Sequence, residues 1–130
     1  MVIQSIYNYA IHLLSGLAMV GIFVALYLRV TPFCELTLIR RGCVAALLSL
    51  GGATLGFSLT VASSILFNAS FVMFLVWGVS AMLVQLLTYV IVSRALPHMN
   101  EALETNNIAM GGLMGLIAVV VGIVNAACLS

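Results

Sequence analysis

Few side chains of this 130-residue sequence could take part in proton chemistry away from water. His12 lies in a long apolar stretch, and imidazole is the side chain that titrates nearest to neutral pH. Asn8 shares its helical face, and Ser63 and Asn125 fall at similar depth in other apolar stretches. Each would leave hydrogen-bonding groups unpaired in lipid. We therefore expect Asn8, His12, Ser63 and Asn125 to form one polar cluster.

Two interpretations of His12 stay open at this point, a hydrogen-bonded structural histidine and a proton relay or ligand site. No catalytic residues are predicted, because no nucleophile and base stand at catalytic spacing. No haem or other cofactor is expected, since haem between helices needs two axial ligands and His12 has no partner histidine there. The sequence does not indicate an enzyme. Gln85 is expected to be an interhelical hydrogen-bond donor.

The three cysteines, Cys34, Cys43 and Cys128, are too few and too scattered for a disulfide framework. A metal site built from Cys34, Cys43 and His98 is conceivable, but the usual C-x-x-C spacing is missing. We therefore predict free thiols and no bound metal.

All charged side chains lie in two short stretches, 29–41 and 94–104, of a chain that is 65% apolar. Ionised groups in a bilayer core cost several kcal/mol each, so this pattern predicts an all-α integral membrane protein with the lipid bilayer as its first partner. Each of four apolar segments can cross about 30 Å of hydrocarbon as a helix. The segments are 5–27, 44–67, 71–92 and 108–129.

The four arginines, Arg29, Arg40, Arg41 and Arg94, fall in the first and third links between these segments. The N-terminus, the turn at Asn68 and the C-terminus carry no lysine or arginine. By the positive-inside rule, the arginines are topology anchors on the cytoplasmic side, and both termini face outside the cytoplasm. Two adjacent arginines are too small a basic patch for nucleic acid, which is not expected as a partner.

The chain repeats itself. The motif Arg-x-x-Pro follows the first segment at 29–32 and the third segment at 94–97. We interpret 1–67 and 68–130 as two tandem helical hairpins of the same orientation, related by a pseudo-two-fold axis along the membrane normal. The alternative is that membrane helices resemble one another by composition.

Each charged link is expected to contain a short helix at the membrane surface. Thr31 and Pro32 have the pattern of an N-cap and a first helical residue, and Gly42 stands where a left-handed residue would end the element. In the second link, Pro97 would begin the corresponding helix, and Asn106 would take the place of the glycine.

The first short helix has an amphipathic pattern. We expect Leu36 and Ile39 to face lipid, whereas Glu35 and Arg40 would face water. Both links would then display their charged groups to the cytoplasm.

The run 31–46 reads Thr-Pro-x-x-Glu-Leu-x-x-Ile-Arg-x-Gly-x-Val-Ala-Ala, and the chain ends with Asn-Ala-Ala-Cys at 125–128. In these runs and in Trp-Gly at 77–78, the sequence resembles the YjfL-type small inner-membrane proteins, the domain of unknown function family numbered 350. The resemblance implies four helices in two tandem repeats, a bacterial inner-membrane location and no established activity. One departure is Cys43, where the family usually has asparagine, as the second copy has at Asn107.

Small residues follow one face of the second and fourth apolar segments. The second contains Gly52 and Gly56, and the fourth contains Gly111, Gly115 and Gly122. Such faces let two helix backbones approach closely, so we expect these helices to be the inner pair, packed through their glycines within one chain or between chains. A pore or substrate lining is the alternative.

Two classes of function remain. The first is a structural or accessory module that assembles as a homo-oligomer and presents its two cytoplasmic loops to a cytoplasmic or membrane protein partner. The second is a small channel or transporter subunit with an uncharged polar pathway. The four segments contain no charged side chain, and four helices are too few to enclose a wide pathway, so we favour the first class.

Overall fold

The computed structural model describes residues 1–32, 34–68 and 70–129, and this part of the chain forms six helices and no strand. The all-helical prediction is confirmed. The long helices are α1 (Val2–Val30), α3 (Val44–Phe67), α4 (Phe71–Ala95) and α6 (Ile108–Cys128). The short helices are α2 (Glu35–Arg40) and α5 (Met99–Glu104).

All four long helices are long and apolar enough to cross a membrane. α1 and α4 continue past the predicted ends at 27 and 92 and include Arg29 and Arg94 in their last turns. A cation at a helix C-terminus interacts favourably with the helix dipole, and a long arginine side chain can reach the headgroup region. The helices therefore run through the arginines rather than stopping before them.

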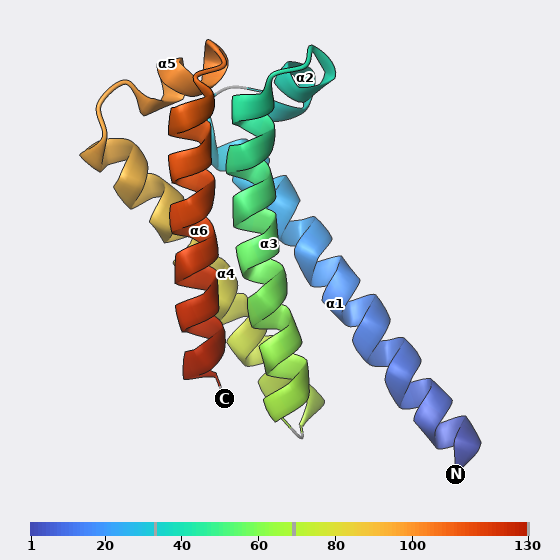
Figure 1. The fold of residues 1–130 in the computed structure, drawn as a ribbon. Coiled ribbons are helices and arrows are strands. Elements are labelled where there is room, and N and C mark those ends of the chain that lie inside the picture. Colours follow the sequence, from blue (N-terminus) through green and yellow to red (C-terminus); the bar gives the residue numbers. More distant parts are fainter. Residues whose placement is uncertain (33, 69, 130) are drawn as a thin grey trace.

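α3 and α6 lie side by side and run in the same direction (Figure 1). α1 and α4 lie behind this pair, are inclined to it and run the opposite way. α2 and α5 both lie at the end where α1 and α4 finish, on either side of the first turns of α3 and α6; we call this end the loop end. Each half of the chain thus has a long, a short and a long helix, whereas the interpretation of 1–67 and 68–130 as duplicated copies stays a prediction.

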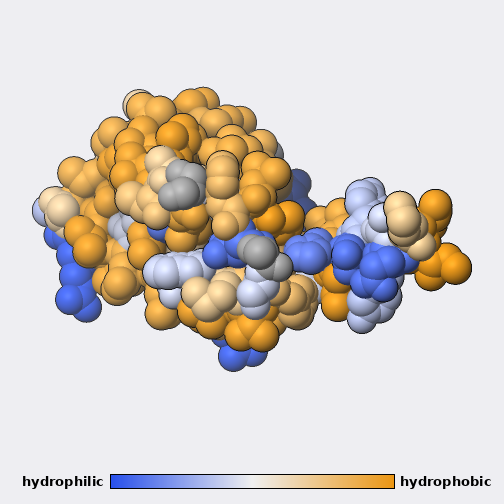
Figure 2. Space-filling view, turned by 90° about the horizontal axis from the view of Figure 1, so that it is seen from below, coloured by the Kyte–Doolittle hydropathy of each residue, from blue (hydrophilic) through white to orange (hydrophobic). Residues whose placement is uncertain are grey.

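The first half of α1 diverges from the other helices (Figure 1). Seen from the end opposite the loop end, the surface is mostly apolar, and the free end of α1 forms a separate lobe (Figure 2). Ile3, Ile6 and Leu14 are among its exposed apolar side chains. This exposed apolar surface suits a helix that is surrounded by lipid or by another chain.

The contact between α3 and α6 is the most extensive in the molecule. Five glycines lie in it: Gly52, Gly56, Gly111, Gly115 and Gly122. A Cβ atom added at Gly52 would lie closer than 3.0 Å to the Gly115 backbone, and one at Gly122 would meet the Gly56 backbone in the same way. Real Cβ atoms do not approach so closely, so these helices pack backbone against backbone.

The two links differ from the predicted starts of their helices. Thr31 caps the end of α1 in an extended conformation, as expected before a proline, so Pro32 ends one helix instead of beginning the next. Pro97 likewise precedes α5 by two residues. Gly42 and Asn106 have φ angles of 86° and 60°, which confirms the predicted left-handed conformations.

Candidate functional site

The four polar residues predicted to cluster do not form one hydrogen-bonded unit among the described residues. The ring Nδ1 of His12 lies 2.8 Å from the backbone carbonyl oxygen of Asn8, to which it donates. Ser63 donates instead to the backbone carbonyl of Ala126 in α6, at 2.6 Å. The first half of α1, which carries Asn8 and His12, diverges from the other helices, whereas Ser63 binds the α6 backbone (Figure 1). The predicted hydrogen-bonded cluster of all four residues is therefore not formed among the described residues.

His12 lies beside an open cavity between α1 and α3. Its ring centroid is 5.8 Å from that of Phe71, edge to face, and 5.7 Å from that of Phe74. The cavity has a volume of about 500 Å³ and is also lined by Asn8, Tyr9, Leu13, Ile65 and Asn68. The backbone hydrogen bond and the two aromatic neighbours favour the interpretation of His12 as a structural histidine.

Two amide side chains of the long helices, Gln85 and Asn125, contain buried polar atoms. Gln85 donates through Nε2 to the backbone carbonyl of Ala118 at 3.3 Å, which confirms the predicted interhelical hydrogen bond from α4 to α6. Its Oε1 atom and the Nδ2 atom of Asn125 are buried without a hydrogen-bond partner in the described structure.

A buried polar cluster that sequence analysis missed lies at the loop end. We call it the loop-end cluster; it comprises Tyr27, Glu35, Ser49, Tyr89 and Asn100. The Tyr27 hydroxyl is 3.2 Å from Ser49 Oγ, and the Tyr89 hydroxyl donates to Asn100 Oδ1 at 2.6 Å. The two tyrosine rings meet edge to face, with centroids 5.3 Å apart. Five helices, α1 to α5, each contribute one residue to the cluster.

Glu35 is the charged member of the cluster, and it is only 1% exposed. Neither carboxyl oxygen has a hydrogen-bond partner among the described residues. Burial raises the pKa of Glu35 from 4.5 to about 7, and the nearby Thr31 hydroxyl has a smaller opposing effect on that pKa. The carboxyl also interacts electrostatically with the hydroxyls of Tyr27 and Tyr89.

The prediction that Glu35 faces water is therefore wrong. α2 begins at Glu35, and residues three and four positions further along share its helical face. These residues, Leu38 and Ile39, pack against the buried core, so their apolar burial brings Glu35 inward with them. Arg40 is exposed, as predicted, and Leu36 is exposed at the surface of α2.

The model of the family described as Domain of Unknown Function (DUF350) matches residues 1–129. The chain belongs to this family. It is 33% identical over 129 residues to the "UPF0719 inner membrane protein YjfL" of Escherichia coli strain K12, across 99% of this chain and 98% of the relative. The protein of that name from Escherichia coli O157:H7 matches with the same identity and coverage. No solved structure matches.

This DUF350 chain is thus a multi-pass inner-membrane protein. It has four helices long and apolar enough to span a membrane, and its relative of nearly the same length is an inner-membrane protein. Neither the family description nor the names of the relatives state an activity. The orientation of its termini stays a prediction.

The N-cap residues of α3 and α6 in this DUF350 chain, Cys43 and Asn107, differ in their contacts. Asn107 caps α6 in the usual way, since its Oδ1 accepts from a backbone N–H of the first turn at 3.3 Å. Cys43 makes no such cap and donates through Sγ to the backbone carbonyl of Leu103 at 3.2 Å. Asn106, in the other half of the chain, accepts through Oδ1 from the Ala45 N–H at 3.0 Å and so caps the first turn of α3.

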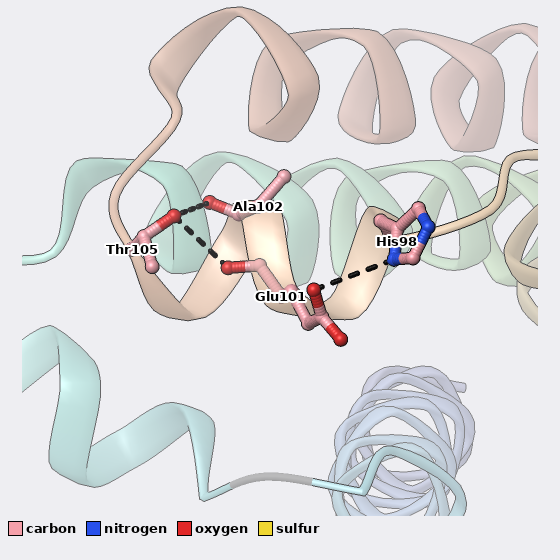
Figure 3. Close-up of polar contacts among 4 residues, drawn as sticks. All are labelled: His98, Glu101, Ala102 and Thr105. Atoms are coloured by element: carbon pink, nitrogen blue, oxygen red, sulfur yellow. Dashed lines mark hydrogen bonds and ion pairs between the residues drawn. The ribbon is translucent and has the colours of Figure 1, made fainter.

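In the same DUF350 structure, α5 has a buried face and an exposed face. Met99 and Leu103 on the buried face are 1% and 0% exposed. On the exposed face, His98 Nδ1 lies 3.4 Å from Glu101 Oε2, and the Thr105 hydroxyl bonds backbone carbonyls of the preceding turn (Figure 3). Both short helices are therefore folded against the bundle with their charged side chains outward, Glu35 excepted.

The three cysteines are free thiols. Cys34 and Cys128 are exposed, and Cys43 is buried. A hydrogen bond from the Thr37 hydroxyl, at 3.0 Å, lowers the pKa of the Cys34 thiol. Cys34 and Cys43 thus offer one accessible and one protected probe at the loop end.

Proposed function

We propose that this chain is an accessory module of the inner membrane that assembles as a homo-oligomer and presents α2 and α5 to a cytoplasmic or membrane protein partner. The observation that carries the proposal is the packing of both short helices onto the loop end. A link that only connects two antiparallel helices does not need buried side chains. Here Glu35, Met99 and Leu103 are each at most 1% exposed, so the links form an ordered surface.

We call that surface the loop-end platform. Its exposed polar side chains carry both signs of charge, with arginines on and after α2 and glutamates on α5. Mixed charge supports recognition of a protein partner by electrostatic complementarity better than binding of nucleic acid. The exposed charged and titratable residues are Arg40, Arg41, His98, Glu101 and Glu104.

The free half of α1 supports assembly of several chains. Gln4, Asn8 and Tyr9 are exposed in the single chain although they lie on a helix long and apolar enough to span the membrane. Polar side chains at membrane depth are favourable when another helix pairs with them. A neighbouring chain packed on this half of α1 would supply such partners.

The middle of the bundle supports the accessory role over the channel or transporter alternative. Phe23 stacks on Phe57 with ring centroids 4.7 Å apart, and Phe74 is fully buried. The buried hydroxyls of Thr60 and Ser64 are engaged by backbone carbonyls at 2.9 and 3.1 Å. A continuous uncharged polar pathway would therefore have to form between chains rather than within one.

Three experiments test the proposal. A photo-reactive residue at position 36, exposed on α2, should give a discrete protein adduct in intact cells, whereas one at position 87, exposed on α4, should not give that adduct. Purified protein in mild detergent should have the mass of several chains by light scattering. Solute or ion flux into liposomes that contain only this protein would instead favour the channel alternative, and a monomeric mass would contradict the assembly.

A further inference from the structure

Glu35 is the most unusual group in the molecule. Its carboxyl is at the first residue of α2 and is almost completely buried. The Thr31 hydroxyl lies close enough to lower its pKa, but neither carboxyl oxygen has a partner at hydrogen-bonding geometry among the described residues. A buried carboxylate in this state is unfavourable, whereas a neutral carboxylic acid loses much less on leaving water. The packed position of α2 therefore favours a bound proton on Glu35.

The hydroxyls around Glu35 do not replace that proton. The Thr31 hydroxyl favours the ionised carboxyl less than burial disfavours it, so the net effect on the pKa is upward. Tyr27 on α1 pairs with Ser49 on α3, and Tyr89 on α4 donates its hydrogen to Asn100 on α5. Both tyrosines interact electrostatically with the Glu35 carboxyl, and neither is a cation. The uncharged neighbours from four helices thus leave a negative charge on Glu35 uncompensated.

Cations and other acids of the loop end lie on its outside. Arg40 and Arg41 follow on the same link, and the arginines in the last turns of α1 and α4 are exposed as well. On α5, His98, Glu101 and Glu104 are exposed. No arginine or histidine contributes to the pKa of Glu35, which burial and the Thr31 hydroxyl determine. A proton is the ligand that this site is built to hold.

We propose that Glu35 is a reversible proton-binding site that holds α2 against the bundle when protonated and releases α2 when it ionises. The loss of one proton to water leaves a carboxylate that is stable only after it reaches solvent. α2 has six residues and Leu38 and Ile39 as its partly buried apolar side chains, so few contacts oppose release. Regulation of the loop-end platform by this step rests on the proposed function, whereas the proton-binding step does not.

The pH window follows from the two pKa values of Glu35. The pKa is about 7 when α2 is packed, and the ordinary value of 4.5 applies when the carboxyl is in water. Packing of α2 is therefore fully favoured below pH 4.5, weakens as the pH rises toward about 7, and then levels off. The gap between the two values corresponds to packing weakened by up to roughly 300-fold.

Cys43 is a native probe of this release. Its backbone N–H donates to the Leu38 carbonyl of α2 at 2.9 Å, and its buried thiol bonds the Leu103 carbonyl of α5. With Cys34→Ser and Cys128→Ser, a maleimide would report only on exposure of Cys43. Thiol ionisation also changes with pH, so the rate must be compared with the same protein carrying Glu35→Gln, which removes the titration and keeps a neutral side chain.

The experiment measures Cys43 labelling of the purified protein in detergent from about pH 5 to about pH 8. We expect the rate relative to the Glu35→Gln protein to rise with pH by at least tenfold and then level off near pH 7. Glu101→Gln, an exposed carboxyl on α5, should leave the profile unchanged. A ratio that stays constant with pH would overturn the proposal.

Infrared spectroscopy gives a second readout that does not require the Glu35→Gln protein to fold. The intact protein should show a protonated carboxyl band that persists above the ordinary pKa of 4.5 and disappears as the pH rises toward about 7, and Glu101→Gln should retain that band. A carboxyl band that is lost at the ordinary pKa of 4.5 would overturn the proposal. Both measurements use the protein without a partner, so a negative result would not contradict the proposed role of the loop-end platform. Conversely, a missing adduct at position 36 would not contradict the proton-binding site.

Discussion

The glycine contact between α3 and α6 allows a sharp test with two adjacent residues. Gly52 lies against the Gly115 backbone, whereas a Cβ atom at Gly51 would meet nothing within 4 Å. Both are in the interior of α3. Gly52→Ala and Gly51→Ala therefore add the same methyl group to neighbouring positions of one helix, and differ in what the methyl group meets.

The expected magnitudes combine two effects. Replacing glycine by alanine in a helix interior stabilises by about 1 kcal/mol, which applies to both variants. Overpacking costs about 1–3 kcal/mol, and at Gly52 the upper end applies because the obstructing atoms are backbone rather than a side chain that can rotate away. We expect Gly52→Ala to lower the free energy of unfolding by about 2 kcal/mol, and Gly51→Ala to be neutral or stabilising.

Unfolding of the purified variants in mild detergent, followed by circular dichroism, measures the difference. Gly115→Ala is a further variant on the opposite helix, because a Cβ there would meet the Leu48 backbone. If Gly52→Ala and Gly51→Ala unfold at the same denaturant concentration, close backbone packing does not hold the two helices together. A lining role for the small residues would then be the better interpretation.

Three other predictions address the topology and the loop end. Cys34 should escape a membrane-impermeant thiol reagent in intact cells and a cysteine at Ser70 should react; the reverse pattern would invert the proposed orientation. Asn106→Gly keeps the left-handed conformation but loses the cap on Ala45, so it should cost about 1 kcal/mol of unfolding free energy, and Asn106→Ala should cost more. Tyr89→Phe removes the hydrogen bond to Asn100 and should cost about 1 kcal/mol, measured in the same unfolding assay, whereas an exposed control such as Tyr7→Phe should be silent.

The sequence alone was sufficient for the long helices and for the close packing of α3 on α6. Length and apolar composition decide whether a segment can span lipid, and both are properties of the segment itself. The spacing of Gly52 and Gly56 on α3, matched by Gly115 on α6, is likewise visible without a structure. Gly42 and Asn106 could be assigned left-handed conformations because few residue types adopt them.

The polar sites could not be assigned in the same way, because they depend on how the helices cross. The proposed meeting of His12 with Asn125 assumed four helices packed together along their whole length. The first half of α1 instead diverges from the other helices (Figure 1). The depth of a residue in the membrane is therefore a weaker predictor of contact than its distance from the point where helices cross.

Glu35 was missed for a different reason, since a helix of six residues is too short for its periodicity to decide which face is buried. A signal was nevertheless present in the repeated motif. Glu35 and Asn100 each stand three residues after the proline of Arg-x-x-Pro, and the structure brings both to the Tyr27 and Tyr89 pair. Asn100 accepts the hydrogen bond of the Tyr89 hydroxyl with a neutral amide, whereas the corresponding residue of the first half, Glu35, is an acid. The carboxyl at this position thus offers what the amide cannot, a side chain whose fit to the buried site changes with pH.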